Sequence, residues 1–335
     1  MPSRGTQGAV PIAWRGMALP NDASRTFGST APPSAAKGKV VFTGLDVEAA
    51  PTAGGIYMGK VGASGPTTLV AIGTTVPGAD DTVPGGAKLN RIGEGLSFDG
   101  RYVSFWGAWG TETREVTVTC PEEGNAIVRQ YCIDKDDNGT PNDGVYVFEV
   151  PLHQGIFQLD TATGNLQLVA QTGDNYEDFL FWNFSGNAGQ GGGEESEEEE
   201  GARWRSSAFI AADGQKVVFK ATEPAINGAD GIFGLYLDLS DLVDPFALLT
   251  SGMDGAILDP KAADLTITSL AIERDSFRNG WLVVNAGMEG VINGEELGWA
   301  GIYITRVPEP ASAALVGLGL APAGLARRRR QPAAA

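Results

Sequence analysis

Short apolar segments, each preceded by a glycine-containing turn, recur along most of the chain. Each segment holds four or five residues rich in Val, Leu and Phe. The segments are Lys39–Phe42, Arg101–Phe105, Lys216–Phe219 and Trp281–Val284, and their turns are Lys37-Gly38, Asp99-Gly100, Asp213-Gly214 and Asn279-Gly280. Because β-branched and aromatic residues between such turns favour extended backbone, each segment is predicted to be a β-strand.

A second strand, opened by glycine, is expected downstream of each of these segments. These second strands begin Gly55-Ile56-Tyr57, Gly155-Ile156-Phe157, Gly234-Leu235-Tyr236 and Gly301-Ile302-Tyr303. A third apolar strand follows in the first three units, at Thr68–Ala71, Leu166–Ala170 and Phe246–Thr250. Ile12–Arg15, which lies before Gly16, has the pattern of the third strand of an earlier unit.

The first strands of the units are separated by 62, 115 and 65 residues, which indicates a repeat of about 63 residues. The long interval carries two predicted loop inserts, 111–151 and 183–201. Antiparallel meanders that repeat in this way favour an all-β fold, a β-propeller-like array of about four antiparallel blades over residues 8–306. The short motifs resemble TolB-type propellers. One or two β-sandwiches built from the same strands are the alternative.

The composition narrows the classes of function. The 335-residue chain is 42% hydrophobic and carries a net charge of −17. Because nucleic-acid binding requires clustered cations, no nucleic-acid partner is expected. His153 is the single histidine, which excludes a multi-histidine metal site and leaves no readable catalytic group of residues. We therefore expect a non-enzymatic protein.

The two cysteines, Cys120 and Cys132, both lie in the first insert. An even number of cysteines in an exported protein favours a disulfide, whereas a redox Cys-x-x-Cys motif is absent. We expect the pair to form a disulfide that closes a small loop.

A candidate calcium loop follows Cys132 directly. Oxygen-bearing side chains at positions 1, 3 and 5 and Gly139 at position 6 match the first half of an EF-hand-type loop. Position 12 is Val145, where a bidentate acidic ligand would be expected, so an acidic surface turn is the alternative. The candidate ligands are Asp134, Asp136, Asn138, the carbonyl of Thr140, and Asn142.

Two other segments have a simpler interpretation. The Glu-rich run between Gly189 and Gly201 is expected to be a solvated insert, because adjacent like charges repel and no apolar residue is present. Trp106 and Trp109, at the end of a strand, would stack on sugar rings if they were exposed, or would pack between blades.

The C-terminus carries the most specific pattern in the chain. Val307-Pro308-Glu309-Pro310 precedes an uncharged apolar stretch, 311–325, which is followed by Arg327, Arg328, Arg329 and Arg330. As a helix the stretch would be about 22 Å long, short against a hydrocarbon core of about 30 Å. The arginines would stay in the cytoplasm by the positive-inside rule.

This order resembles the PEP-CTERM sorting signal of bacterial exosortase substrates over residues 307–330. The resemblance implies a short C-terminal transmembrane sorting helix, recognition at Pro308-Glu309-Pro310 and removal of the tail by an exosortase-type enzyme at the inner membrane. It further implies a mature protein at the cell surface or in the extracellular matrix. Residues 1–30 contain no signal-peptide pattern, so we expect the natural start to lie upstream.

The expected function is therefore a binding or structural role outside the cell. Envelope polysaccharide or other surface proteins are the expected partners, with calcium as the one candidate cofactor. The alternative is a secreted propeller hydrolase that acts on polysaccharide, with acidic side chains from several blades converging on the central axis.

Overall fold

The fold is all-β, as predicted. The structure is a computed structural model, and it describes residues 10–48, 50–80, 82–93, 95–122, 125–134, 143–186, 202–224, 232–239 and 244–307. Within these ranges the strands are antiparallel, and the helices are α1 (Ala126–Asp134) and the 3₁₀ turns Gly255–Ile257 and Pro260–Ala262. No helix among the described residues has the length and apolar character needed to cross a membrane.

Four sheets follow one another along the chain. The first contains β3 (Ser29–Thr30), β4 (Ser34–Ala36), β5 (Lys39–Leu45), β6 (Gly54–Lys60) and β7 (Thr67–Ala71). The second contains β8 (Leu89–Ile92), β9 (Ser97–Phe98), β10 (Tyr102–Thr119), β11 (Val145–Asp160) and β12 (Leu166–Gln171). The third contains β15 (Ile210–Asp213), β16 (Lys216–Thr222), β17 (Phe233–Asp238) and β18 (Phe246–Thr250). The fourth contains β19 (Thr266–Ala271), β20 (Phe277–Arg278), β21 (Trp281–Ile292) and β22 (Glu295–Arg306).

The repeat seen in the sequence corresponds to these sheets. In each sheet a short strand leads through the glycine-containing turn into the first predicted strand, which pairs with the second. In the first three sheets the second strand pairs with the third. Ile12–Arg15, by contrast, is not a strand. Ile12 instead packs close to Gly59, against the outer face of the first sheet.

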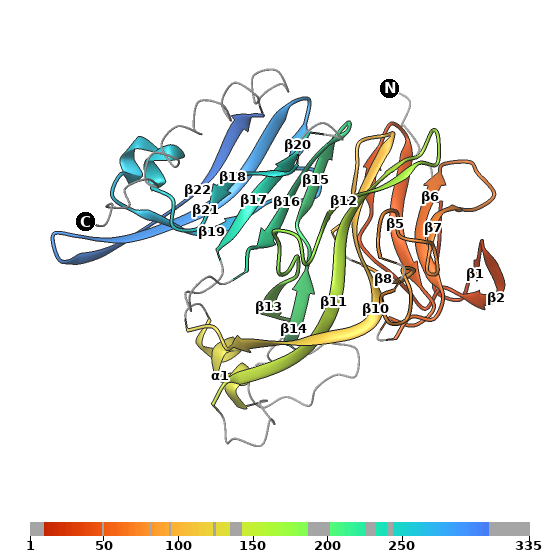
Figure 1. Cartoon of the computed structure of the whole chain (residues 1–335), viewed down its shortest axis with the longest axis horizontal. Coiled ribbons are helices and arrows are strands. Elements are labelled where there is room, and N and C mark those ends of the chain that lie inside the picture. The colour runs from red at the N-terminus through yellow and green to blue at the C-terminus, as the bar shows by residue number, and fades with distance from the viewer. Residues whose placement is uncertain are drawn as a thin grey trace, which may run out of the picture.

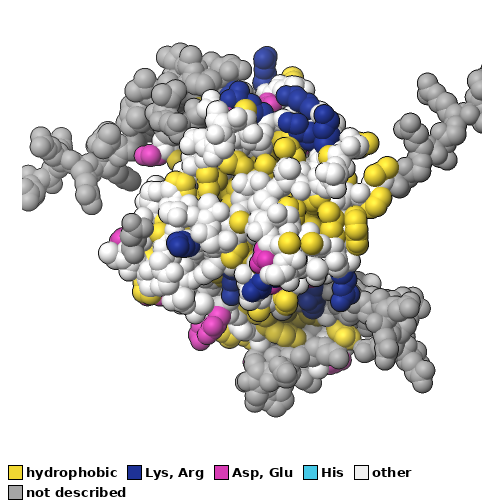
Figure 2. Space-filling view, turned by 90° about the vertical axis from the view of Figure 1, so that its right-hand side faces the viewer, with side chains coloured by type: hydrophobic (Ala, Val, Ile, Leu, Met, Phe, Trp, Pro, Cys, Tyr) yellow, Lys and Arg dark blue, Asp and Glu magenta, His cyan; other side chains and the backbone are white. Residues whose placement is uncertain are grey.

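Successive sheets pack face to face, and an apolar layer fills each of the three interfaces (Figure 1). Val41 and Ile56 of the first sheet, for example, share one layer with Phe157 of the second. The hairpin of β1 (Ala18–Leu19) and β2 (Asp22–Thr26) lies beside the free face of the first sheet, where Leu19 belongs to an apolar cluster. Figure 2 shows the end of the row where the first sheet lies, with hydrophobic side chains among polar ones.

Two buried serines join β4, β9, β15 and the loop before β20, which are the short segments that lead into the glycine-containing turns. Ser34 Oγ in β4 accepts the Phe98 N–H at 3.1 Å and donates to Asp275 at 3.2 Å. Ser97 Oγ in β9 accepts the Ala212 N–H at 3.1 Å and donates to a carbonyl in the loop before β20 at 2.6 Å. All four sheets are therefore linked where β4, β9, β15 and β20 meet.

The Arg278 guanidinium occupies this junction. It donates to the carbonyls of Phe98 in the second sheet at 2.8 Å and Ala212 in the third at 2.6 Å. It also donates to the carbonyl of Phe277 at 2.9 Å and pairs with the Asp275 carboxylate. Because a guanidinium presents several donors in a fixed fork, one side chain satisfies acceptors from three segments.

The Asp-Gly turns link neighbouring sheets in the same region. Asp99 Oδ2 accepts the Gly214 N–H at 2.8 Å, and Asp213 Oδ2 accepts the Gly280 N–H at 2.6 Å. Each aspartate of a turn therefore binds the turn of the following sheet. The aspartate of the Asp-Gly dipeptide therefore does more than form its own turn. It also joins one sheet to the next.

Replacement of Arg278 by Ala is expected to lower the free energy of unfolding by about 2 kcal/mol, because buried carbonyls lose a charged donor. Arg278→Lys is the matched control. It keeps the charge but lacks the planar fork, so it should recover less than half of the loss. Urea denaturation at neutral pH measures both effects, and an Arg278→Ala protein as stable as the wild type would contradict this role.

Candidate functional site

The first predicted insert is a structured projection, so its prediction as loop was wrong. β10 and β11 are 18 and 16 residues long and continue as one ladder past an irregularity, with Thr113 opposite Pro151 and Thr119 opposite Val145. We call residues 111–134 and 143–151 the arm. The arm extends away from the four sheets and carries α1 near its end (Figure 1). Alternation of Val and Thr in 116–119 is a strand signal that could have revealed it.

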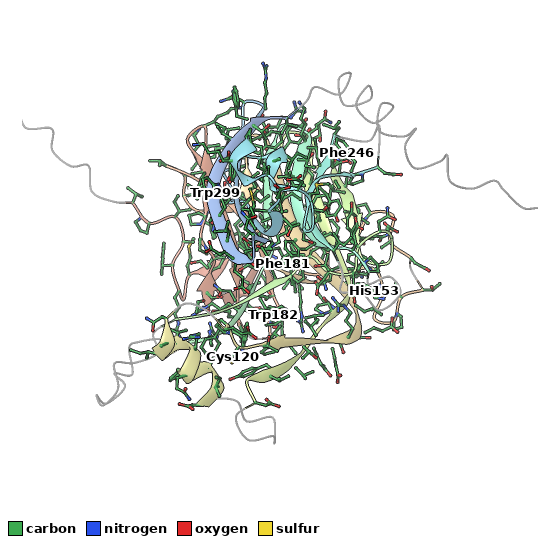
Figure 3. The ribbon with its side chains drawn as sticks, turned by 90° about the vertical axis from the view of Figure 1, so that its left-hand side faces the viewer. Cys120, His153, Phe181, Trp182, Phe246 and Trp299 are labelled. Atoms are coloured by element: carbon green, nitrogen blue, oxygen red, sulfur yellow. A yellow bond between two sulfur atoms is a disulfide. The ribbon has the colours of Figure 1, made fainter. Side chains whose placement is uncertain are left out.

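Aromatic side chains attach the second insert to the arm. The hairpin of β13 (Phe181–Ser185) and β14 (Arg203–Ser207) flanks the predicted acidic loop, whose residues 187–201 lie outside the described part of the chain. The rings of Phe148 and Trp182 stack with their centroids 4.4 Å apart, and Tyr146 meets Trp204 edge-on at 5.8 Å. Figure 3 shows Trp182 near the arm. The two inserts therefore form one module.

A buried ion pair ties the arm to the body. Arg114 in the arm donates to the Asp178 carboxylate, which lies between β12 and β13 and is almost fully buried. Burial raises the pKa of Asp178, because it disfavours the charged carboxylate, and the hydrogen bond from Leu180 N–H and the Arg114 charge oppose that rise. The orientation of the arm thus depends on Arg114 staying in place.

A disulfide closes the end of the arm, as predicted. Cys120 follows β10, Cys132 lies in α1, and their Cα atoms are 5.9 Å apart. The Tyr146 hydroxyl donates to the Cys132 carbonyl at 2.5 Å. Cys120 N–H donates to the Gly144 carbonyl at 2.8 Å. Together these contacts hold α1 against the two strands of the arm.

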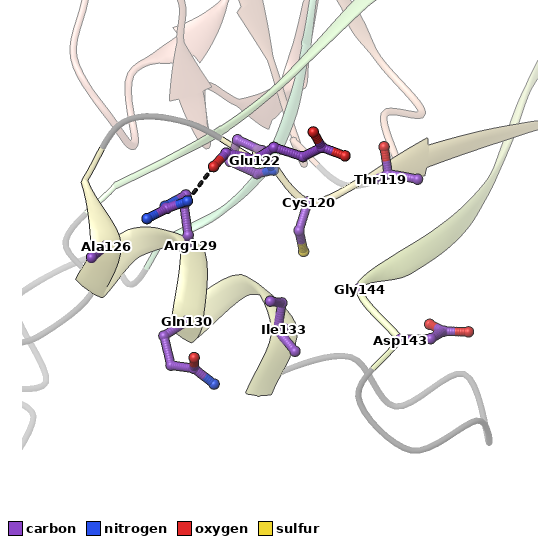
Figure 4. A pocket seen from close by; sticks show the side chains of 10 residues that line it. Thr119, Cys120, Glu122, Ala126, Arg129, Gln130, Ile133, Asp143 and Gly144 are labelled. Atoms are coloured by element: carbon purple, nitrogen blue, oxygen red, sulfur yellow. Dashed lines mark hydrogen bonds between the residues drawn. The ribbon is translucent and has the colours of Figure 1, made fainter.

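An open depression of about 620 Å³ lies beside the disulfide (Figure 4). Arg129, whose guanidinium donates to the Glu122 carbonyl, lines one side. Gln130 and Asp143 also line it, so both charged and amide groups face the opening. Such a mixture suits a polar ligand rather than a purely apolar one.

The structure describes one of the five candidate calcium ligands, Asp134. Asp134 is the last residue of α1, and its carboxylate accepts a hydrogen bond from Gln130 at 2.8 Å. The other four candidate ligands lie outside the described residues, namely Asp136, Asn138, Thr140 and Asn142. The described ranges contain no group of three or more His, Cys, Asp or Glu side chains that could hold a metal ion. Calcium binding therefore stays a prediction.

The tryptophans considered for sugar stacking are in the core, so that interpretation was wrong. Trp106 is 6% exposed and Trp109 is 2% exposed. Trp106 Nε1 donates to Gln154 at 3.1 Å, and Trp109 stacks with His153. The His153 ring also lies 3.1 Å from the Glu112 carboxylate, which gives this histidine structural contacts on both sides.

The sorting motif is described only at its first residue. Val307 is buried, and its N–H donates to the Gly280 carbonyl at 2.9 Å, so the folded body includes it. The remaining residues of the pattern, Pro308, Glu309, Pro310 and Arg327–Arg330, lie outside the described residues.

Lys220 is a half-buried cation that sequence reasoning missed. Its Nζ lies 3.9 Å from the ring centroid of Phe181, 4.9 Å from that of Phe233 and 5.2 Å from that of Phe209. Burial lowers its pKa from the ordinary 10.5 to about 8, because the apolar surroundings disfavour the ammonium. Contact with aromatic faces compensates part of that cost. The sequence signal for it is weak. Lys220 lies two residues after Val218 in β16, so a charged side chain shares a face of the strand with an apolar one.

This pKa predicts a pH dependence of stability. Between pH 8 and 10.5 the folded protein binds fewer protons at Lys220 than the unfolded chain, so its stability rises with pH across this interval. Lys220→Met keeps the volume and removes the titration. Urea unfolding of both proteins should show the wild type gaining stability relative to the variant as the pH rises. A difference that stays constant with pH would contradict the assignment.

Comparisons with protein families, with curated proteins and with solved structures find no match to this chain. The resemblances to a PEP-CTERM sorting signal and to TolB-type propellers therefore rest on the sequence alone.

Proposed function

We propose that this chain is an exported bacterial protein of the cell surface or extracellular matrix, with its C-terminal tail processed by an exosortase-type enzyme. The observation that carries the proposal is the order of the C-terminal segments. Pro308-Glu309-Pro310, the apolar stretch 311–325 and the four arginines 327–330 follow one another as in a PEP-CTERM sorting signal.

The disulfide supports an extracellular location. Disulfides persist in oxidising compartments and are rare in the cytosol of most organisms. Cys120 and Cys132 are the only two cysteines of the chain, and they are joined to each other. The bridge holds the end of the arm, a part of the molecule with few contacts to the body.

We further propose that the four sheets are blades of an open propeller-like array. They follow the chain in order, and their short strands β4, β9, β15 and β20 meet around Ser34, Asp275 and Arg278, as inner strands of blades would. Three apolar layers join the four sheets in a row, whereas a closed ring would require a fourth layer between the last sheet and the first. A pair of β-sandwiches would not bring one short strand from each of four sheets to a single junction.

The role that fits best is binding or structural. A propeller hydrolase would need carboxylates that can reach a substrate, whereas the carboxylates at this junction are occupied. Asp275 pairs with Arg278, and Asp99 and Asp213 accept backbone N–H groups of neighbouring turns. The arm offers a projecting, disulfide-braced surface with a polar depression, suited to contact with envelope polysaccharide or another surface protein.

Calcium would stiffen the loop after α1. A carboxylate at the C-terminal end of a helix is disfavoured by the helix dipole, and a bound cation beside Asp134 would remove that cost. The wild-type protein is expected to melt at a higher temperature with millimolar calcium than with a chelator. Asp134→Ala combined with Asp136→Ala should abolish the rise, and Asp80→Ala with Asp22→Ala, elsewhere on the surface, should not. An undiminished rise in the first variant would refute the site.

Cell fractionation followed by intact mass spectrometry tests export and sorting. The expected product lies at the cell surface or in the medium and ends near Pro310, without Arg327–Arg330. A cytoplasmic product that retains the four arginines would overturn the proposal. The fold and the array of sheets would be unaffected by that outcome.

A further inference from the structure

The fourth sheet lacks the outer strand that each of the other three sheets has. In the first three sheets the second predicted strand, β6, β11 or β17, pairs with β5, β10 or β16 on one side and β7, β12 or β18 on the other. Its counterpart β22 pairs with β21 along its whole length. No strand among the described residues pairs with the other edge of β22, which leaves that edge free.

The pairing of the outer strand follows one rule in all three complete sheets. The glycine that opens the second strand lies opposite the residue 16 positions later, Ala71, Gln171 or Thr250. Positions are counted here from the opening glycine. The residue after the glycine lies opposite position 15, and the residue after that lies opposite position 13, because a register shift separates the two pairs. The register is therefore a property of the repeat.

The tail sequence fits the same rule. A glycine stands 18 residues after the opening glycine in each complete unit, at Gly73, Gly173 and Gly252, with φ of +90°, +91° and +81°. Counting 18 from Gly301 gives Gly319. Position 15, which is Val70, Ala170 or Leu249 and buried in each, is Val316 in the fourth unit.

The opening glycine itself indicates a missing neighbour. A Cβ at Gly55 would lie 2.0 Å from the Val70 carbonyl oxygen, one at Gly155 3.0 Å from that of Ala170, and one at Gly234 2.8 Å from that of Leu249. The outer strand thus comes too close for a side chain. Gly301 is kept in the fourth unit, where the nearest described atoms belong to the Tyr303 ring.

The face that carries the residue after this glycine is also uncovered in the fourth sheet, unlike in the other three. Ile56, Ile156 and Leu235 are completely buried, whereas Ile302 is 78% exposed. Ile304, two residues later on the same face, is 66% exposed. Figure 3 looks onto the molecule from the side of the fourth sheet, where Trp299 marks β22. An uncovered apolar face beside a free strand edge is otherwise an aggregation hazard.

We propose that residues 313–317 of this chain pair with the free edge of β22 and form the outer strand of the fourth sheet. Gly317 then lies opposite Gly301, Val316 opposite Ile302 and Ala313 opposite Ile304. The pairing itself does not rest on the proposed function. If the tail is also a sorting signal, the same residues cannot insert into a membrane while they form this strand, so insertion requires their release from β22.

Cross-linking of the full-length chain tests the register. Ile304→Cys with Ala313→Cys places both thiols on one face and directly opposite, so a second disulfide should form in detergent-free buffer. Ile304→Cys with Ala314→Cys is the control, because a shift of one residue turns the second thiol to the other face. Peptide mapping without reduction should find the new bridge in the first variant only. Its absence there, or equal cross-linking in both, overturns the proposal.

Hydrogen exchange on the full-length chain tests whether the tail covers β22 at all. Val316→Asp should speed exchange of amides in 301–306 by at least about tenfold, because it weakens the outer strand. Leu320→Asp lies beyond Gly319 and makes an equal change in the apolarity of the tail. It should leave exchange in β22 unchanged. Equal effects of the two substitutions, or none, contradict the proposal, and neither measurement depends on export.

Discussion

The first three sheets are apolar on both faces, and this constraint determines how the chain is arranged. The first sheet buries Val41 and Ile56 against the second sheet and Phe42 and Tyr57 under the N-terminal hairpin. No sheet can leave both faces in water without exposing a large apolar area. The sheets therefore form a row, each covering the next. Contacts among β4, β9, β15 and β20 hold neighbouring sheets together, and Arg278 donates hydrogen bonds to carbonyls of β9 and β15.

The same constraint explains the two ends of the row. At one end β1 and β2 cover the first sheet with a cluster around Leu19 and Phe27. At the other end the fourth sheet leaves Ile302 and Ile304 in solvent. In a repeat array the terminal units need special capping. The proposed outer strand would complete the fourth sheet but would cover only its edge, so the face around Ile302 is where a further layer would pack.

The arm is independent of this arrangement and concentrates the features that suggest contact with other molecules. It is held by a disulfide at its end, by stacked rings along its length and by the Arg114–Asp178 pair near its base. These are the kinds of interaction that stabilise a projection whose own apolar cluster, around Cys132 and Phe184, is small. Rigidity of this sort reduces the ordering cost of binding, which favours a binding role over a purely space-filling one.

The sequence by itself determined the repeated strands of the four sheets and their order. Runs such as Lys216–Phe219 between glycine-containing turns can hardly form anything else, because local backbone preference and apolar pattern agree. The cysteine pair and the repeat were also readable, since they depend on counting and spacing. The repeat spacing further extends beyond the described residues to Gly319, where local pattern alone suggested only an apolar tail.

Only the tertiary structure decided which residues meet across long separations. The pattern around Trp106 and Trp109 fitted an exposed aromatic surface as well as a core. Packing decided for the core, since Trp106 lies between the second and third sheets and Trp109 between the first and second. Nothing near Arg278 or Lys220 in the chain marks them, because their partners come from other sheets or from distant strands. The long hairpin of the arm was mistaken for loop because part of its support comes from rings of β13 and β14. Those strands begin about 20 and about 40 residues after β11 ends. Pairing and burial of this kind depend on the whole fold, so short-range sequence preferences do not determine them.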